Sequence, residues 1–455
     1  MNTLKPNILF FVIDSFRADK CFGDSKTSIT PNLDNLQKNG ISFTQTISTV
    51  ATTIPSLGSI FTSKFPNNVG LSVEKFEQLN LDSPTYLQIF KKNGYDTNAT
   101  MPEIASDFGL TCDFKNDDSS YDNYFGLFDG LGDKILQKLS SNNFKTPWFL
   151  YIHLFDLHTP IILPSEFDDK QYGESNYEKM ISAIDHWIGK IINKVDLENT
   201  LIILTADHGE YVPVIHHNNE IINFESGIGE SKLWLLGNKV PPQLYPLKKK
   251  FGFLLRKMRK SNKKSKLSNL SLSTYEKRVM LESRMSEGHR MFDDLLHVPL
   301  IISGPSLPEN KVIKTQVRQV DIFPTIADII GIEPISQIDG TSLLPLINDK
   351  DVEELPAYIE SPPTITGNLK KVIGIRTSKY KFLKSSDETK NVFELYDLQN
   401  DPLEENNIVN TQTQIVTEME SILMQIGKKS TKNNESMDAK KRKIVRDNLR
   451  KLGYV

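Results

Sequence analysis

Short apolar runs alternate with amphipathic segments along most of this 455-residue chain. The runs are rich in β-branched and aromatic residues and are bounded by polar ones, which is typical of strands covered on both faces. We expect strands at Asn7–Ile13, Trp148–Phe155, Thr200–Thr205 and Val298–Ser303, and at a shorter run in GIRTSKYKFL, residues 374–383.

Helical periodicity appears between these runs. Pro31–Gly40 begins with proline, follows Thr30 as a candidate N-cap and ends at glycine. Asn176–Val195 and Gln319–Gly331 are further expected helices. Strands that alternate with helices predict an α/β fold, with a large mixed, mostly parallel sheet sandwiched between helices.

The end of the chain has a different pattern. Residues 355–407 hold short strand-like pieces separated by turn signals, which predicts a small antiparallel sheet. We therefore expect a catalytic α/β domain over residues 1–350, interrupted by a basic insertion at about 240–285. A small α+β subdomain follows at 351–427, and a basic tail occupies 428–455.

The composition is that of a globular protein with a large core. Hydrophobic residues make up 38% and charged residues 24% of the chain, and two cysteines exclude a disulfide scaffold or a thiolate zinc site. No run of 18 apolar residues occurs, and the first apolar run is too short for a membrane span. These features favour a cytoplasmic protein.

The net charge of −3 conceals two strongly basic segments, 247–267 and 428–451, in an otherwise acidic chain. In the first, aromatic and aliphatic residues are interspersed among lysines and arginines. This segment is either an amphipathic helix on an anionic membrane surface, a solvated helix packed on the body, or a site for another polyanion. The first choice would add a peripheral position at the inner membrane face. No readout motif for a specific nucleic acid accompanies the charge.

Candidate chemistry lies where the expected strands end. Asp14 follows the first strand, Asp207 and His208 follow Thr200–Thr205, and Asp156 and His158 follow Trp148–Phe155. Ligands of parallel sheets bind at this edge, and carboxylates with imidazoles suit a divalent metal ion. A helix cap is the ordinary alternative for each aspartate taken singly.

A hydroxyl group precedes an apolar helical segment in TTIPSLGSI, residues 52–60. A hydroxyl at such a helix start would be surrounded by free N–H groups, and a metal-activated threonine of this segment could attack a bound anionic ester. An ordinary Thr or Ser N-cap is the alternative role for this segment.

Seven segments together resemble the sulfatases and, more broadly, the alkaline phosphatase superfamily, which also contains phosphonate monoester hydrolases and the phosphoglycerol and phosphoethanolamine transferases. The resemblance extends over roughly residues 5–410. The segments, in order, are PNILFFVIDSFRAD, TPNLDNLQKNGISF, TIPSLGSIFTSKFP, TADHGE, GHRMFDDLLHVPLIISGP, VDIFPTIADIIGI and ELYDLQNDPLEENN.

The resemblance implies roles for individual residues. Asp14, Asp207 and His208 would hold a single divalent metal ion, which could be Mn, Mg, Zn or Ca, and Thr53 at the nucleophile position would also bind it through Oγ. His158 and His289 would act on the leaving group or line the same pocket. The substrate would be an anionic ester, carried by a lipid head group or a glycan.

Two departures from the sulfatase pattern change the expected chemistry. Thr53 stands where sulfatases have a cysteine or serine that is oxidised to an aldehyde, and the methyl group on threonine Cβ prevents that oxidation. Leu57 replaces the motif's arginine, and Ser15 replaces a second aspartate. We therefore expect phosphate-ester hydrolysis or transfer through a phospho-threonine, as in the threonine-using transferases. A sulfatase with unmodified threonine and a catalytically silent binding protein are the alternatives.

Other histidines give weaker signals. His153 lies within an expected strand and is interpreted as a core residue. His216 and His217 could reach the pocket, but a surface loop is the favoured position for them. His297 could pair with an acid.

Overall fold

The computed structural model describes residues 5–71, 73, 77–79, 84–116, 126–141, 144–218, 220–227, 252, 257–259, 261–282, 291–333, 335–362, 371–385, 393–427, 437, 441–443 and 445–446. His289 and nearly all of the basic tail lie outside these residues, so their predicted roles stay predictions. None of the helices in the described part of the chain has the length and apolar character that a bilayer crossing requires.

A nine-stranded sheet forms the centre of the molecule, with strand order β10-β2-β9-β6-β1-β5-β3-β4 and β11 beside β2. All of its pairings are parallel except those of β9 with β2 and β6. The mixed, mostly parallel sheet confirms the predicted fold class. Its strands are β1 (Asn7–Ile13), β2 (Ile41–Ile47), β3 (Asp96–Thr100), β4 (Lys115–Asn116), β5 (Trp148–Leu154), β6 (Thr200–Thr205), β9 (His297–Ser303), β10 (Lys311–Ile313) and β11 (Val317–Arg318).

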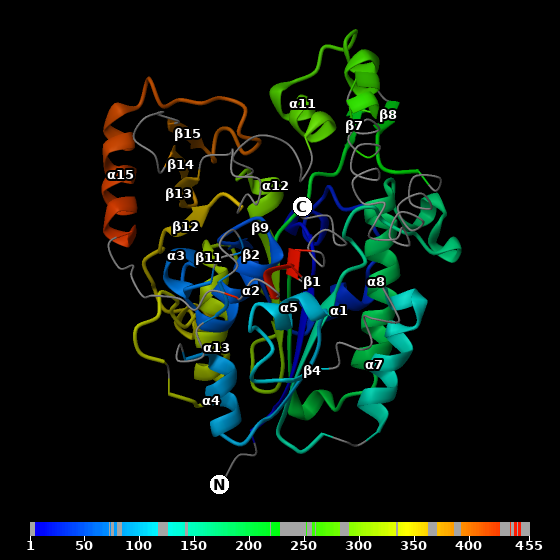
Figure 1. Ribbon diagram of the computed structural model, residues 1–455, viewed down its shortest axis with the longest axis vertical. Helices are drawn as coiled ribbons and strands as arrows, with labels where there is room; N and C mark the ends of the chain where they lie inside the picture. The colour runs from blue at the N-terminus through cyan, green and yellow to red at the C-terminus, as the bar shows by residue number, and fades with distance from the viewer. Residues whose placement is uncertain are drawn as a thin grey trace.

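Helices cover both faces of this sheet: α1, α7 and α8 lie on one side, and α2, α4 and α13 on the other (Figure 1). The α-helices are α1 (Pro31–Lys38), α2 (Thr53–Thr62), α3 (Pro66–Val69), α4 (Tyr86–Lys92), α5 (Glu103–Asp107), α7 (Leu131–Ser140), α8 (Asn176–Ile192), α11 (Thr274–Leu281), α12 (Asp293–Leu296), α13 (Ile322–Ile329), α14 (Leu344–Ile347) and α15 (Thr413–Gly427). Short 3₁₀ helices are η1 (Ala18–Lys20), η2 (Leu127–Asp129), η3 (Ser165–Phe167), η4 (Lys170–Tyr172), η5 (Leu197–Asn199) and η7 (Gln319–Asp321).

Strand β1 has an almost continuous apolar sequence because both of its faces are buried. Successive side chains point to opposite faces, so Phe10 joins one hydrophobic core and Phe11 the other. The Phe10 ring stacks on Phe323 of α13, with 5.5 Å between ring centroids. Full burial of such a side chain contributes about 1.5 to 3 kcal/mol. Two helical layers therefore fix β1 from both sides.

Helix α1 begins where predicted, but Thr30 is not its capping side chain. The carboxylate of Asp185, on α8, accepts hydrogen bonds from the backbone N–H groups of Asn32 and Leu33. The N-terminus of α1 is therefore capped from a neighbouring helix.

A four-stranded antiparallel sheet forms the C-terminal region, as predicted, with α15 packed against it. Its strands are β12 (Ala357–Glu360), β13 (Val372–Arg376), β14 (Tyr380–Ser385) and β15 (Phe393–Asp397). The run 374–383, expected as a single strand, is instead the turn of the β13–β14 hairpin with its flanking residues. Polar residues at its centre, Thr377–Lys379, allow the reversal.

Above the carboxyl edge of the central sheet lies a hairpin of β7 (Val214–His217) and β8 (Glu220–Asn223), with α11 nearby (Figure 1). His216 belongs to this hairpin, where it is exposed and lies 2.9 Å from Glu174. It is therefore a surface residue, although it sits in a strand rather than a loop.

Candidate active site

Three neighbouring strands bring the candidate residues to one edge of the sheet. Strand β1 lies between β5 and β6, and Val12 pairs with His153 on one side and Thr205 on the other. Asp14 follows β1 directly, and Asp207 follows β6 by two residues. Parallel pairing therefore places residues from positions 14, 153 and 207 side by side.

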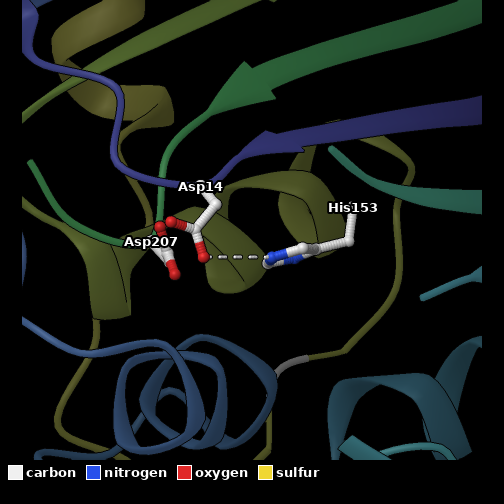
Figure 2. Close-up of side chains that lie close together, drawn as sticks. All are labelled: Asp14, His153 and Asp207. Carbon is white, nitrogen blue, oxygen red and sulfur yellow. Dashed lines mark ion pairs between the residues drawn. The ribbon is translucent and has the colours of Figure 1, made fainter. Parts of the chain in front are cut away.

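Asp14, His153 and Asp207 form a compact buried cluster (Figure 2). Each offers a ligand-type atom, and these atoms all lie within 4.8 Å of one another. The His153 Nε2 atom lies 3.8 Å from Asp14 Oδ2, and His208 Nε2 lies 3.5 Å from Asp207 Oδ2. Two carboxylates and two imidazoles thus converge at the end of β1.

The chemistry of this cluster fits a divalent cation. The buried atoms Asp207 Oδ2, His153 Nε2 and His208 Nε2 have no hydrogen-bond partner within the described residues. Burial raises the pKa of Asp207, and the adjacent Asp14 carboxylate raises it further. Buried like charges are costly without a cation between them, and oxygen with imidazole ligands suits Mg²⁺, Mn²⁺ or Zn²⁺.

His153 is buried in a central strand, as expected of a core residue, but it also faces the candidate metal site. Its ring is fully buried, but Nε2 is directed at Asp14 and Nδ1 lies 3.1 Å from the Tyr151 hydroxyl. A proton on Nδ1, donated to the Tyr151 oxygen, leaves the Nε2 lone pair facing the carboxylates. Strand periodicity alone does not distinguish this histidine from an apolar neighbour, because both are buried.

Thr53 joins the same cluster from the first position of α2. Its Oγ1 donates a hydrogen bond to Asp14 Oδ2 at 3.0 Å, and the residue is buried. The N-cap of α2 is Thr52, not Thr53. The Thr53 hydroxyl therefore faces a carboxylate and stands at the positive end of a helix, where anions bind.

Ser15 contacts both carboxylates of the cluster, a role that the sequence did not indicate. It adopts a left-handed backbone conformation, with φ of 67°, immediately after Asp14. Its N–H donates to Asp207 Oδ1 at 3.1 Å, and its hydroxyl donates to Asp14 Oδ1. The residue that replaces a second aspartate therefore orients both carboxylates of the cluster.

The backbone carbonyl of Asp207 is held by three buried side chains. The Ser48 and Ser56 hydroxyls each lie 2.7 Å from this oxygen, and Gln319 Nε2 donates to it at 3.1 Å. These groups come from the loop after β2, from α2 and from η7. Three segments distant in sequence thus fix the position of one aspartate.

His158 lies in the loop after β5 and is buried. Its ring centroid is 5.8 Å from that of Phe155, which lies 4.9 Å from the ring of His153. Asp156 in the same loop faces away, because its Oδ1 accepts from the Leu127 N–H at 2.9 Å. The ring of Phe155 therefore contacts both His158 and His153.

Two other residues lie outside the cluster. His297 Nε2 contacts the Thr44 carbonyl at 2.7 Å, and burial lowers its pKa. Leu57 packs in the hydrophobic core beside Ile54 and Ile60, so no charged group from that position reaches the site.

Comparison with known families identifies the chain. The model of the family described as "Sulfatase" matches residues 6–332, and that of "N-sulphoglucosamine sulphohydrolase, C-terminal" matches residues 281–429. The chain therefore belongs to the sulfatase family of the alkaline phosphatase superfamily, and it is a sulfatase-like ester hydrolase.

Individual relatives agree with this family. Arylsulfatase K of Xenopus laevis is 21% identical over 461 residues, covering 93% of this chain and 83% of that protein. Arylsulfatase K of Bos taurus is 22% identical over 465 residues, covering 92% and 81%.

Solved structures show the same fold. The phosphonate monoester hydrolase of Agrobacterium radiobacter has a TM-score of 0.66 at 17% identity, covering 92% of this chain and 95% of that one. A 2-O GAG sulfatase has a TM-score of 0.64 at 16% identity, covering 96% of each chain.

Proposed function

We propose that this protein hydrolyses sulfate esters carried by a glycan, at the cluster formed by Asp14, Thr53, His153, Asp207 and His208. Its family, the Arylsulfatase K relatives and the likeness to a 2-O GAG sulfatase support a sulfate ester more than a phosphate ester. The threonine-based phosphoryl transfer expected from sequence therefore has less support than the sulfatase alternative.

The observation that carries the proposal is the contact between Thr53 Oγ1 and Asp14 Oδ2 at 3.0 Å. In the proposed reaction the Thr53 hydroxyl passes its proton to Asp14, and its oxygen forms a bond to sulfur. The bond from sulfur to the glycan oxygen breaks, and that oxygen takes a proton from His158. Thr53 then carries the sulfate and the glycan leaves as an alcohol.

A water molecule completes the cycle. Its oxygen attacks sulfur, the Thr53 oxygen recovers its proton from Asp14, and the protons of the water pass to His158 and to solvent. The products are sulfate and the free enzyme. Asp14, Asp207, His153 and His208 would hold a divalent ion, and its positive charge would lower the pKa of a hydroxyl and stabilise anionic oxygens.

Phosphate-ester hydrolysis is the second candidate, favoured by two specific residues. Thr53 cannot form the aldehyde of sulfatases, and the buried Leu57 supplies no positive charge to support one. A directly attacking hydroxyl is well suited to phosphorus.

One experiment separates the two candidates. Purified protein loaded with Mn²⁺, Mg²⁺ or Ca²⁺ is offered nitrophenyl sulfate, nitrophenyl phosphate and bis-nitrophenyl phosphate. We expect sulfate cleavage that falls by about 10³-fold or more in Thr53→Ala, because the nucleophile is lost. The matched control is Thr62→Ala, at the other end of α2, where the hydroxyl contacts the Gly58 carbonyl.

Each outcome has a defined meaning. Preferential phosphate cleavage that depends on Thr53 would replace the proposal by the second candidate. Sulfate cleavage that survives in Thr53→Ala would remove Thr53 as nucleophile. Equal losses in Thr53→Ala and Thr62→Ala would show that the effect is structural.

A further inference from the structure

The segment between β8 and α11 is strongly basic. Residues 231–275 contain twelve lysines and arginines and no aspartate or glutamate. The described part of it comprises residues 252, 257–259 and 261–275, and residues 257–259 and 261–267 among them are helical. Nothing in the reaction proposed above uses this charge.

The segment is packed through its apolar residues against the loop that follows His208. Leu267 and Leu272 are buried in one cluster with Tyr211 and Leu295. Tyr211 follows His208 by three residues, on the loop that leaves the catalytic cluster. The packing therefore joins the basic segment to the loop that carries two of the candidate metal ligands.

Polar contacts hold the segment to the β7–β8 hairpin as well. Arg259 donates to the Phe224 carbonyl at 2.9 Å and to the Ser226 hydroxyl at 3.3 Å. The Lys263 ammonium group lies 5.4 Å from the centroid of the Phe224 ring. Such cation–π contacts are favourable and directional.

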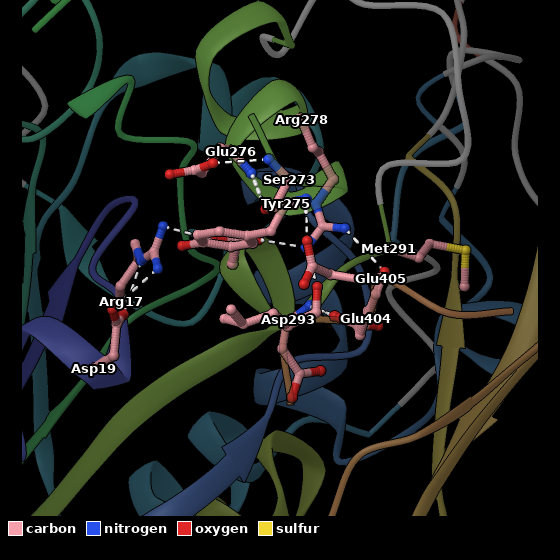
Figure 3. A network of polar contacts seen from close by, with 12 residues as sticks. Arg17, Asp19, Ser273, Tyr275, Glu276, Arg278, Met291, Asp293, Glu404 and Glu405 are labelled. Atoms are coloured by element: carbon pink, nitrogen blue, oxygen red, sulfur yellow. Dashed lines mark hydrogen bonds and ion pairs between the residues drawn. The ribbon is translucent and has the colours of Figure 1, made fainter. Parts of the chain in front are cut away.

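A third anchor runs through α11 to the loop after Asp14 (Figure 3). Arg278 of α11 lies 3.4 Å from Asp294, and Asp294 also pairs with Arg17 at 2.7 Å. Arg17 is three residues beyond Asp14. The end of the insertion is thus fixed to both loops that supply the catalytic carboxylates.

Three lysines of this anchored segment, Lys257, Lys264 and Lys266, are exposed to solvent, and we call them the basic wall. We propose that the basic wall binds the polyanionic chain of a sulfated polysaccharide, so that the ester in the active site belongs to a longer sulfated substrate. This inference rests on the proposed function. Its physical basis is charge complementarity between an exposed basic surface and a polyanion, on a segment packed against the loops that follow Asp14 and Asp207.

The environment of the segment favours a soluble polyanion over a membrane surface. Membrane binding by a basic helix needs an exposed apolar face that enters the bilayer. Leu267 and Leu272 are instead buried against the protein body, and Leu270 is partly buried there. In the described part of the segment, the exposed large apolar residue is Met258. The membrane surface, one of the three alternatives left open by the sequence, is therefore the competing outcome of the test.

The test measures binding of heparin, used as a sulfated polysaccharide probe, to the full chain without turnover. The variant Lys257→Gln/Lys264→Gln/Lys266→Gln is compared with Lys38→Gln/Lys91→Gln/Lys92→Gln, which removes the same charge from exposed positions on α1 and α4. We expect the basic-wall variant to bind heparin about tenfold more weakly than the control variant, with a shallower dependence on salt.

A second measurement connects the surface to catalysis. The ratio of kcat/KM for a sulfated oligosaccharide to that for nitrophenyl sulfate should fall about tenfold in the basic-wall variant alone. Equal heparin affinity in the two variants would overturn the inference. Tighter binding to phosphatidylserine vesicles than to heparin, lost in the basic-wall variant, would replace it with the membrane surface.

The heparin measurement needs no turnover. A failure of the proposed ester hydrolysis is therefore distinguishable from a failure of the basic wall.

Discussion

Two groups of buried charges lie near the same edge of the sheet, and they are built in opposite ways. Around β1, Asp14 and Asp207 face each other, and the buried atoms Asp207 Oδ2, His153 Nε2 and His208 Nε2 lack hydrogen-bond partners among the described residues. Around α12, Asp293 lies 2.8 Å from Arg376 and 2.5 Å from Lys381, and Lys381 also contacts Glu404 at 2.6 Å. The second group balances its charge with the chain's own residues.

The pKa values of Asp207 and Asp293 shift in opposite directions, as expected from this difference in charge compensation. Burial and the neighbouring Asp14 carboxylate both raise the pKa of Asp207. Burial would also raise the pKa of Asp293, but Arg376 and Lys381 outweigh it and lower the pKa. A carboxylate whose charge is not compensated within the chain is a candidate for binding, whereas a compensated one joins parts of the fold.

The largest effect is expected from a substitution in the first group, around Asp14 and Asp207. Asp207→Asn should lower kcat/KM by about 10³-fold for whichever ester the wild-type enzyme cleaves, because a candidate metal ligand loses its charge. The same change should stabilise the chelator-treated protein by about 1 kcal/mol, since it removes a buried like-charge contact. Ester hydrolysis and thermal unfolding in excess chelator measure the two effects. A destabilised metal-free variant would contradict this contrast.

Breaking the second group should affect stability instead. Lys381→Met removes a fully buried ammonium group and leaves Asp293 and Glu404 without their shared partner. We expect a loss of about 3 to 5 kcal/mol in the free energy of unfolding, measured in denaturant. The control is Lys379→Met, an exposed lysine of the same hairpin, with an expected change below about 0.5 kcal/mol.

Lowering the pH should remove the contribution of Asp293 to the free energy of unfolding. The folded-state pKa of Asp293 is lowered, so its contribution to stability is complete above the ordinary pKa of about 4. That contribution is lost as the pH falls from about 4 towards the lower folded-state pKa. The free energies of unfolding of wild type and Asp293→Asn should therefore converge on acidification. A constant difference between pH 7 and pH 3 would argue against this charge compensation.

The smallest expected effect refines the geometry around Asp207. Ser56→Ala removes one of the groups that contact the Asp207 carbonyl, at a cost of about 1 kcal/mol in stability and a reduction of kcat of about tenfold or less. Ser59→Ala on the same helix is the control, because Ser59 Oγ is buried with no hydrogen-bond partner among the described residues. Similar losses of kcat in both variants would show that α2 packing, rather than the carbonyl contact, is responsible.

Much of the fold could be predicted because its strands are covered on both faces. The runs at β1, β5, β6 and β9 stand out as continuous apolar segments. Strand β2 was missed, because Thr44, Gln45 and Thr46 interrupt its apolar character. The antiparallel direction of β9 could not be derived either, since a buried run has the same appearance in both directions.

The site could be predicted only in part, for a related reason. Asp14, Asp207 and His208 are conspicuous because each polar side chain ends an apolar run, and Thr53 was found through the family resemblance. His153 and Gln319 are buried inside regular elements, so only the pairing of distant segments gives them a function. The left-handed conformation of Ser15 likewise follows from its contacts, not from its residue type.

The hydrogen bond from Gln319 to the Asp207 carbonyl has a consequence for synthesis on the ribosome. A nascent chain exposes Asp14 and Thr53 early, yet β1 cannot be flanked on both sides until β5 and β6 have emerged. Even then Asp207 lacks the amide that η7 supplies more than a hundred residues later. The candidate metal cluster is therefore completed late in translation, after most of the domain has left the ribosome.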